Sequence, residues 1–231
     1  MSMALALPFA SNAAVVPDRT RVIYNEGAQS ESVTVTNKSP KFPFLIQSWI
    51  EDSQGKKVTS PFVVLPPLQR VQPNERNVVR IASTQLASLP SDRESAFYLN
   101  IREIPPKAEV ANALQIALHS KMKLFYRPKS IQPERGIDTT LAMTVRIDSA
   151  AGKLVFENPT PFHISIVGLA TGDKKTTAPF ESLMVSPMSE AEAPYKGALP
   201  SMLYVSHVND FGGETEVPYA CDAGQCRSAQ K

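Results

Sequence analysis

The sequence is short of the residues and motifs that enzymes use. Its 231 residues include only three histidines, two cysteines and one tryptophan. No G-x-S-x-G, H-E-x-x-H or G-x-G-x-x-G motif occurs, and no phosphate-binding glycine loop. The neighbouring acids Glu51 and Asp52, and those at 92–94, are better explained as solvated loop charges than as acid–base pairs. An enzyme, including a secreted hydrolase, is therefore not expected.

Blocks of one charge and long apolar runs are also missing. The chain has 24 basic and 22 acidic residues, a formal net charge of +2, with the two signs interspersed. Nothing therefore points to nucleic acid or to an anionic membrane surface. The apolar stretch at residues 1–10 is too short to span a bilayer, so no stable membrane insertion is expected. No helix of three turns with a clean 3.6-residue period stands out.

What the sequence does have is proline and short strand-like runs. Twenty prolines against ten glycines suit an all-β chain with many connections. Seven runs in the first half are the number expected of an immunoglobulin-like sandwich. The pattern restarts after residues 127–130, which predicts two sandwich domains, at 15–128 and 129–231. The expected strands are 21–24, 32–35, 43–51, 63–65, 77–81, 96–103 and 114–126, then 140–147, 153–156, 162–169, 181–185, 203–208 and 216–221.

The first fourteen residues and the two cysteines bear on the compartment. Residues 1–14 are apolar and end in small residues, which favours a residual signal peptide, although a basic start is missing. The alternative is a tail outside the fold. Export would place Cys221 and Cys226 in an oxidising space, where a disulfide across their four-residue spacer persists. Zinc is the rival explanation, but it needs about four ligands and the histidines are scattered singly.

The stretch from Phe97 to Pro128 is the best candidate for a binding surface. Leu114, Ile116 and Leu118 alternate with Gln115, Ala117 and His119, as in a strand with one apolar face. Such a row on an exposed strand would invite pairing with another chain. The alternative is that these residues face their own core, and the period of two alone does not distinguish the two arrangements.

A family resemblance joins these stretches. The sequence resembles the periplasmic chaperones of the chaperone–usher pathway, the PapD-like family, over nearly its whole length from Val15 to Cys226. Single matches are weak, but together and in order they are specific. The matching segments are 18–21 (DRTR), 43–51, 66–70, 92–95, 97–106, 114–128, 158–162 (NPTPF) and 209–213 (NDFGG).

The resemblance implies two immunoglobulin-like domains set at an angle around a cleft. Arg21 and Lys123 would hold the terminal carboxylate of a bound pilus subunit through charge-assisted hydrogen bonds. Without the resemblance, each is an ordinary exposed charge. The strand with Leu114, Ile116 and Leu118 would fill a groove in a subunit that lacks its own final strand.

The resemblance also implies an interdomain charge network and a set of partners. Glu94, Arg127 and Asp210 would meet at the hinge and fix the domain angle. Fimbrial subunits and an outer-membrane usher are the expected partners, in the periplasm and without a cofactor or metal. A homodimer in which the free protein caps its own apolar strand stays open. The alternative function is an exported structural or adhesive immunoglobulin-like protein.

Overall fold

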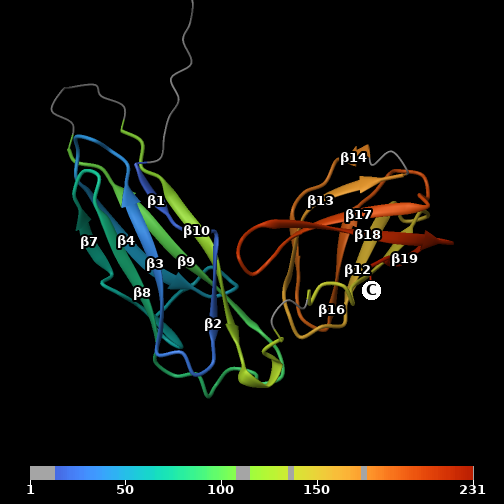
Figure 1. Cartoon of the computed structure of the whole chain (residues 1–231), viewed down its shortest axis with the longest axis horizontal. Helices are drawn as coiled ribbons and strands as arrows, with labels where there is room; N and C mark the ends of the chain where they lie inside the picture. The colour runs from blue at the N-terminus through green and yellow to red at the C-terminus, as the bar shows by residue number, and fades with distance from the viewer. Residues whose placement is uncertain (1–13, 108–114, 135–137, 173–175, 231) are drawn as a thin grey trace, which may run out of the picture.

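The protein folds into two β-rich bodies, each around its own hydrophobic core (Figure 1). The computed structural model describes residues 14–107, 115–134, 138–172 and 176–230. Within these ranges the only helix is the single turn η1 (Lys129–Ile131). No helix in the described ranges is long and apolar enough to cross a membrane. The all-β prediction is confirmed. Residues 1–13 and Leu114, for which the sequence also made predictions, lie outside the described residues.

The first domain consists of two sheets. The smaller sheet has four strands, and the larger sheet has six, among them the two that carry Arg21 and Lys123. The order in the smaller sheet is β1 (Val15–Pro17), β3 (Ser30–Asn37), β8 (Arg76–Ser83) and β6 (Phe62–Leu65). The order in the larger sheet is β2 (Arg21–Asn25), β10 (His119–Arg127), β9 (Ser95–Ile104), β4 (Phe44–Glu51) and β5 (Lys57–Val58), with β7 (Leu68–Val71) against β4.

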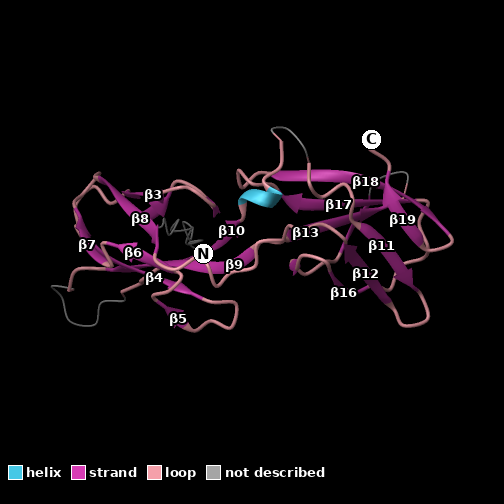
Figure 2. Ribbon diagram, turned by 90° about the horizontal axis from the view of Figure 1, so that it is seen from below, coloured by secondary structure: helices cyan, strands magenta, loops and turns pink. Residues whose placement is uncertain are grey.

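The second domain follows η1, which Figure 2 shows between the two bodies, beyond the end of β10. Its strands form one continuous network around the second core. The order is β14 (Thr176–Ala178), β13 (Ile164–Thr171), β17 (Met202–Val208), β18 (Glu214–Asp222), β19 (Gln225–Ser228), β11 (Thr144–Asp148), β12 (Lys153–Asn158) and β16 (Ser189–Pro194), with β15 (Leu183–Val185) against β13.

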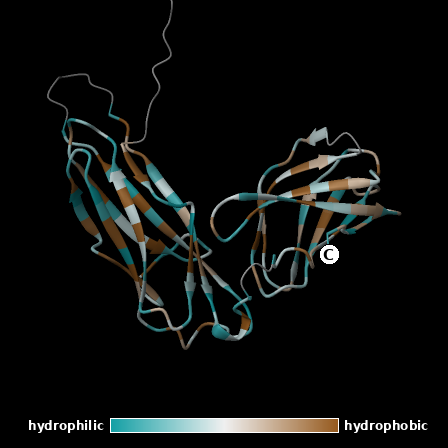
Figure 3. Cartoon of the chain, viewed as in Figure 1, coloured by the Kyte–Doolittle hydropathy of each residue, from teal (hydrophilic) through white to brown (hydrophobic). Residues whose placement is uncertain are grey.

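Alternation of apolar and polar residues explains why these segments form half-buried strands. In β4, Ile46 and Ile50 point into the first core while Trp49 lies on the opposite face. The same alternation appears as brown and teal bands along the strands in Figure 3. Tyr24 and Phe62 are fully buried at the centre of the first domain, with ring centroids 4.9 Å apart.

The strand predicted at 114–126 begins later than its alternation suggested. β10 starts at His119, where His119 pairs with Arg102 of β9. Continuing that register would bring Ile116 opposite Pro105, in the double proline that follows β9. Proline has no backbone N–H to donate, so the ladder cannot extend there. The sequence analysis also missed six strands, namely β1, β5, β7, β14, β16 and β19.

The disulfide expected near the end of the chain is confirmed. Cys221 of β18 lies directly opposite Cys226 of β19, and their sulfur atoms are bonded at 2.02 Å. The bond closes the hairpin turn against the second core, where Cys226 is fully buried. Both sulfurs are consumed, so neither cysteine can serve as a zinc ligand.

Candidate functional site

Arg21 and Lys123 lie side by side where the first domain meets the second. β2 and β10 run parallel, and their register places Lys123 directly opposite Arg21. Both side chains reach the second domain: Arg21 Nη1 donates to the Val208 carbonyl at 2.8 Å, and Lys123 Nζ donates to Ser165 Oγ at 2.7 Å. Two residues 102 positions apart in the chain therefore form one cationic site, in which both side chains donate to neutral oxygens.

Within the described residues, neither of these two cations is bonded to a carboxylate, although Arg21 is buried and Lys123 is partly buried. Arg21 is only 7% exposed. Burial lowers the pKa of Lys123, and the positive charge of Arg21 lowers it further. Burial likewise lowers the pKa of Arg21, although Asp210 and Glu94 oppose that shift. An anion placed between the two side chains would relieve both effects.

Arg21 also has a hydrogen-bond donor to spare. Its buried Nε is one of two buried side-chain polar atoms in the described part of the chain that lack a partner, the other being Ser48 Oγ. Buried polar groups are normally satisfied, and an unsatisfied one costs about 1–3 kcal/mol. A carboxylate that accepted from this nitrogen would gain a charge-assisted bond and remove that cost.

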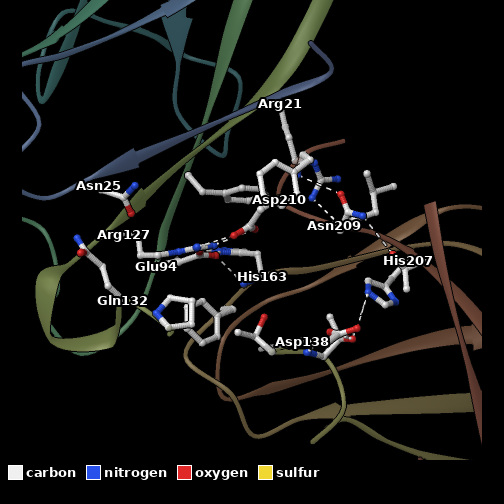
Figure 4. Close-up of a pocket in the computed structure, with 18 of the residues that line it drawn as sticks. Arg21, Asn25, Glu94, Arg127, Gln132, Asp138, His163, His207, Asn209 and Asp210 are labelled. Carbon is white, nitrogen blue, oxygen red and sulfur yellow. Dashed lines mark hydrogen bonds and ion pairs between the residues drawn. The ribbon is translucent and has the colours of Figure 1, made fainter. Parts of the chain in front are cut away.

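Glu94, Arg127 and Asp210 meet between the domains, as Figure 4 shows. Arg127, the last residue of β10, binds Glu94 Oε1 at 2.7 Å through Nη2 and Asp210 Oδ2 at 2.6 Å through Nη1. The Arg127 and Glu94 side chains are 6% and 1% exposed, whereas Asp210 is 44% exposed. Burial opposes the charge of Arg127, but its bonds to Asp210 and Glu94 outweigh burial and raise its pKa.

His163 is a member of this network that the sequence did not reveal. Its backbone N–H donates to Glu94 Oε2 at 2.8 Å, and its ring stacks on Phe125 of β10 with centroids 5.1 Å apart. In the sequence His163 is an isolated histidine, and its contacts depend on both domains. The one available signal was position: His163 follows directly after the NPTPF segment, where the second domain contacts Glu94.

A hollow of about 560 Å³ lies beside these residues, between the domains. It is lined by Arg21, Glu94 and Arg127 from the first domain and by His207 and Asp210 from the second (Figure 4). His207 is buried, 3.2 Å from Thr140 Oγ1 and 3.6 Å from Asp138 Oδ2. Burial lowers the pKa of His207, Arg21 adds to that shift, and Asp138 opposes it.

The lowered pKa of His207 predicts a loss of stability in mild acid. The unfolded chain binds a proton at His207 near the ordinary value of 6.5, before the folded protein does. Stability should therefore fall as the pH drops below 6.5. Urea unfolding at about pH 7.5 and about pH 5.5 measures this effect. His207→Gln should lose less stability than wild type over that step, and an equal loss in the two proteins would contradict the prediction.

The predicted donor residues lie where the chain enters β10. Ile116 and Leu118 are 54% and 36% exposed, and Leu114 falls outside the described residues. Leu118 is held by Glu103 of β9: its carbonyl accepts from Glu103 N at 3.0 Å, and its N–H donates to Glu103 Oε1 at 3.1 Å. These two residues do not face their own core, which removes the alternative arrangement for them.

One edge of β10 is open next to this segment. Residues 119–122 pair with β9 on one side, whereas pairing with β2 on the other side begins only at Lys123. In the described part of the chain, the stretch from His119 to Met122 therefore has an unpaired backbone edge. This edge leads directly to the two cations, so strand pairing and carboxylate binding could use one continuous surface.

Two family models match the chain in succession. The N-terminal domain of the pili and flagellar-assembly chaperone PapD matches residues 14–132, and the C-terminal domain of the pili assembly chaperone PapD matches residues 137–219. The chain belongs to the PapD family of pilus-assembly chaperones. Members of the PapD family are chaperones and not enzymes, in agreement with the motifs that the sequence lacks.

Individual PapD-family proteins are similar over almost the whole length. The chaperone protein PmfD of Proteus mirabilis is 42% identical over 236 residues, 99% of this chain and 92% of the relative. The periplasmic chaperone SfaE superposes with a TM-score of 0.71 at 32% identity, over 88% of this chain and 98% of that one. The structure of the Salmonella enterica SafA pilin in complex with the SafB chaperone matches with a TM-score of 0.78 at 26% identity, over 90% and 96%. These likenesses confirm the two immunoglobulin-like sandwiches.

Proposed function

We propose that this PapD-family protein is a periplasmic chaperone that captures fimbrial subunits in its cleft and delivers them to an outer-membrane usher. The periplasmic location is supported by the relative SfaE, which is described as a periplasmic chaperone. Capture of a subunit is supported by the relative SafB, whose structure was solved with a pilin. For the usher, the support is the family resemblance of the sequence.

The observation that carries the proposal is the position of Arg21 and Lys123 at the end of an open strand edge. A subunit terminus can place its carboxylate between the two cations and run its last strand along residues 119–122 of β10. The carboxylate fixes where that strand starts. Because strand side chains alternate between faces, this starting point decides which of them point into the shared core.

The apolar residues before β10 supply the second half of the interaction. Ile116 and Leu118 are exposed in the free protein and would enter a groove of the subunit as β10 extends along its partner. Burying one such side chain contributes about 1.5–3 kcal/mol. Together with the backbone hydrogen bonds of the added strand, this burial provides binding free energy without ATP or another cofactor.

Co-expression with a fimbrial operon tests the proposed function. The protein is purified from the periplasmic fraction, and the complex is weighed by native mass spectrometry. We expect one chaperone with one small subunit. Recovery of the chaperone alone, with every subunit of the operon present in the same fraction, would contradict the proposal. A mass of two chaperone chains in the absence of subunit would identify the self-capping homodimer.

A further inference from the structure

One face of the larger sheet of the first domain carries a set of cationic and aromatic side chains in addition to Lys123. The strand registers place Lys121 opposite Asn100 and Asn100 opposite Trp49 across β10, β9 and β4. Side chains that are opposite one another share a face, and the face repeats every second residue. Lys123 therefore lies on the same face, two residues along β10. We call the group formed by Trp49, Lys57, Tyr98, Arg102, His119 and Lys121 the Trp49 platform.

The platform continues the sheet face that carries Lys123, and it stays open to solvent. Lys123 lies on the same face and donates to Ser165 of the second domain, so at Lys123 this face points toward the second domain. Lys57, Arg102 and Lys121 are exposed, so the second domain does not cover this part of the sheet. The opposite face of the same strands is buried in the first core, with Ile50 and Leu99 at its centre.

The cations of the platform are held over aromatic rings. Lys57 Nζ lies 5.9 Å and Arg102 Cζ lies 5.6 Å from the centroid of the Trp49 ring. Lys121 Nζ lies 4.7 Å from the centroid of Tyr98. A cation over a ring face is attracted by the π system and keeps a defined position. These positive charges are therefore already arranged before a partner arrives.

The carboxylate of Glu51 lies among these cations and is already engaged. Glu51 accepts from Lys121 Nζ at 2.7 Å and from Trp49 Nε1 at 2.7 Å. Within the described ranges, neither Lys57 nor Arg102 forms an ion pair; Arg102 donates to the neutral Gln47 at 2.6 Å. The platform thus carries more positive than negative charge, next to the edge at which a partner strand would pair.

We propose that the Trp49 platform is a second contact surface for the bound fimbrial subunit and that it takes acidic side chains from the subunit body. This inference rests on the proposed function. A subunit whose terminus lies at Arg21 and Lys123, and whose strand runs along β10 toward His119, must pass beside the platform. Its excess of positive charge selects an acidic surface there and repels a basic one, so the platform discriminates between subunits that share the same strand-pairing mode.

The test uses the full-length chaperone and the subunit recovered by co-expression, refolded together. Arg102→Glu and Lys57→Glu reverse one platform charge each, and Arg80→Glu on β8 makes the same charge change on the other sheet of the domain. We expect both platform variants to associate about tenfold more slowly at low salt, with a weaker salt dependence, because charges near an interface act mainly on association. Arg80→Glu should associate as wild type does.

A second readout is specific to this face. Trp49 is the only tryptophan of the chain, so incorporation of fluorotryptophan places a single fluorine label on the platform. The fluorine resonance should shift when the subunit binds. A normally formed complex with an unshifted resonance, or platform variants that associate as Arg80→Glu does, would overturn the platform and leave the proposed function standing. A shift that appears on concentrating the chaperone alone would assign the face to a second copy and also overturn it. Wild-type chaperone that binds no subunit would overturn the proposed function itself.

Discussion

Replacing Arg21 or Lys123 by alanine is expected to abolish recovery of a fimbrial subunit with the chaperone. Each variant leaves the subunit's terminal carboxylate with one donor group in place of two, in a site where Arg21 is 7% exposed. Loss of one partner from a desolvated charge pair costs about 2–5 kcal/mol. By the relation of about 1.4 kcal/mol per tenfold, affinity should fall by tens to thousands of times. Co-purification from the periplasm and titration of the refolded subunit measure the loss.

Arg19→Ala is the matched control for this experiment. Arg19 lies two residues before Arg21 and pairs with Asp18 at 3.0 Å, but the two side chains are 40% and 37% exposed. An exposed pair contributes only about 0–1 kcal/mol, so this variant should capture subunits normally. Circular dichroism must show all three variants folded. Wild-type recovery with folded Arg21→Ala and Lys123→Ala would contradict the anchor role.

The part of the fold that the sequence predicted well consists of strands in which apolar and polar residues alternate. The central strands β4 and β9 alternate because one face of each is buried, and both were expected near their observed positions. Edge strands such as β5, with two residues, carry no such pattern and were missed. The start of β10 was misplaced because alternation records which face is apolar, whereas Pro105 and Pro106 decide where the ladder ends.

The residues of the candidate site were likewise predicted only in part from the sequence. The residues at its centre were found through their resemblance to family segments, because Arg21 and Lys123 are neighbours only in three dimensions. His163 was missed because its role depends on stacking against Phe125 of the other domain. The platform was missed for a related reason: Trp49, Arg102 and Lys121 lie on three strands, and their common face follows only from the registers.

Arg127→Ala is expected to uncouple the two domains while leaving each sandwich folded. Arg127 supplies the guanidinium that is bonded to Glu94, and the Glu94 side chain is 1% exposed. Removing one partner of a buried pair costs about 3–5 kcal/mol, because the remaining charge stays buried and uncompensated. The backbone N–H of His163 would still donate to Glu94 Oε2 at 2.8 Å, but the guanidinium would be lost. The domains should then sample a wider range of angles, and subunit capture should weaken.

Asp210→Asn is the comparison that separates the buried bond of Arg127 to Glu94 from its exposed bond to Asp210. It binds the same guanidinium at 2.6 Å, but its side chain is 44% exposed, so water can replace the lost contact. Asp210→Asn should therefore change the domain arrangement much less than Arg127→Ala does. Small-angle scattering of the free proteins reports the spread of domain angles, and a subunit pull-down reports capture. Because Arg127 is the last residue of β10 and both carboxylates bind it from outside the strands, we expect the buried Glu94 bond to fix how the second domain meets Arg21 and Lys123. Unchanged scattering together with unchanged capture in Arg127→Ala would rule out that role, and an equal effect in Asp210→Asn would show that the exposed half of the network carries it.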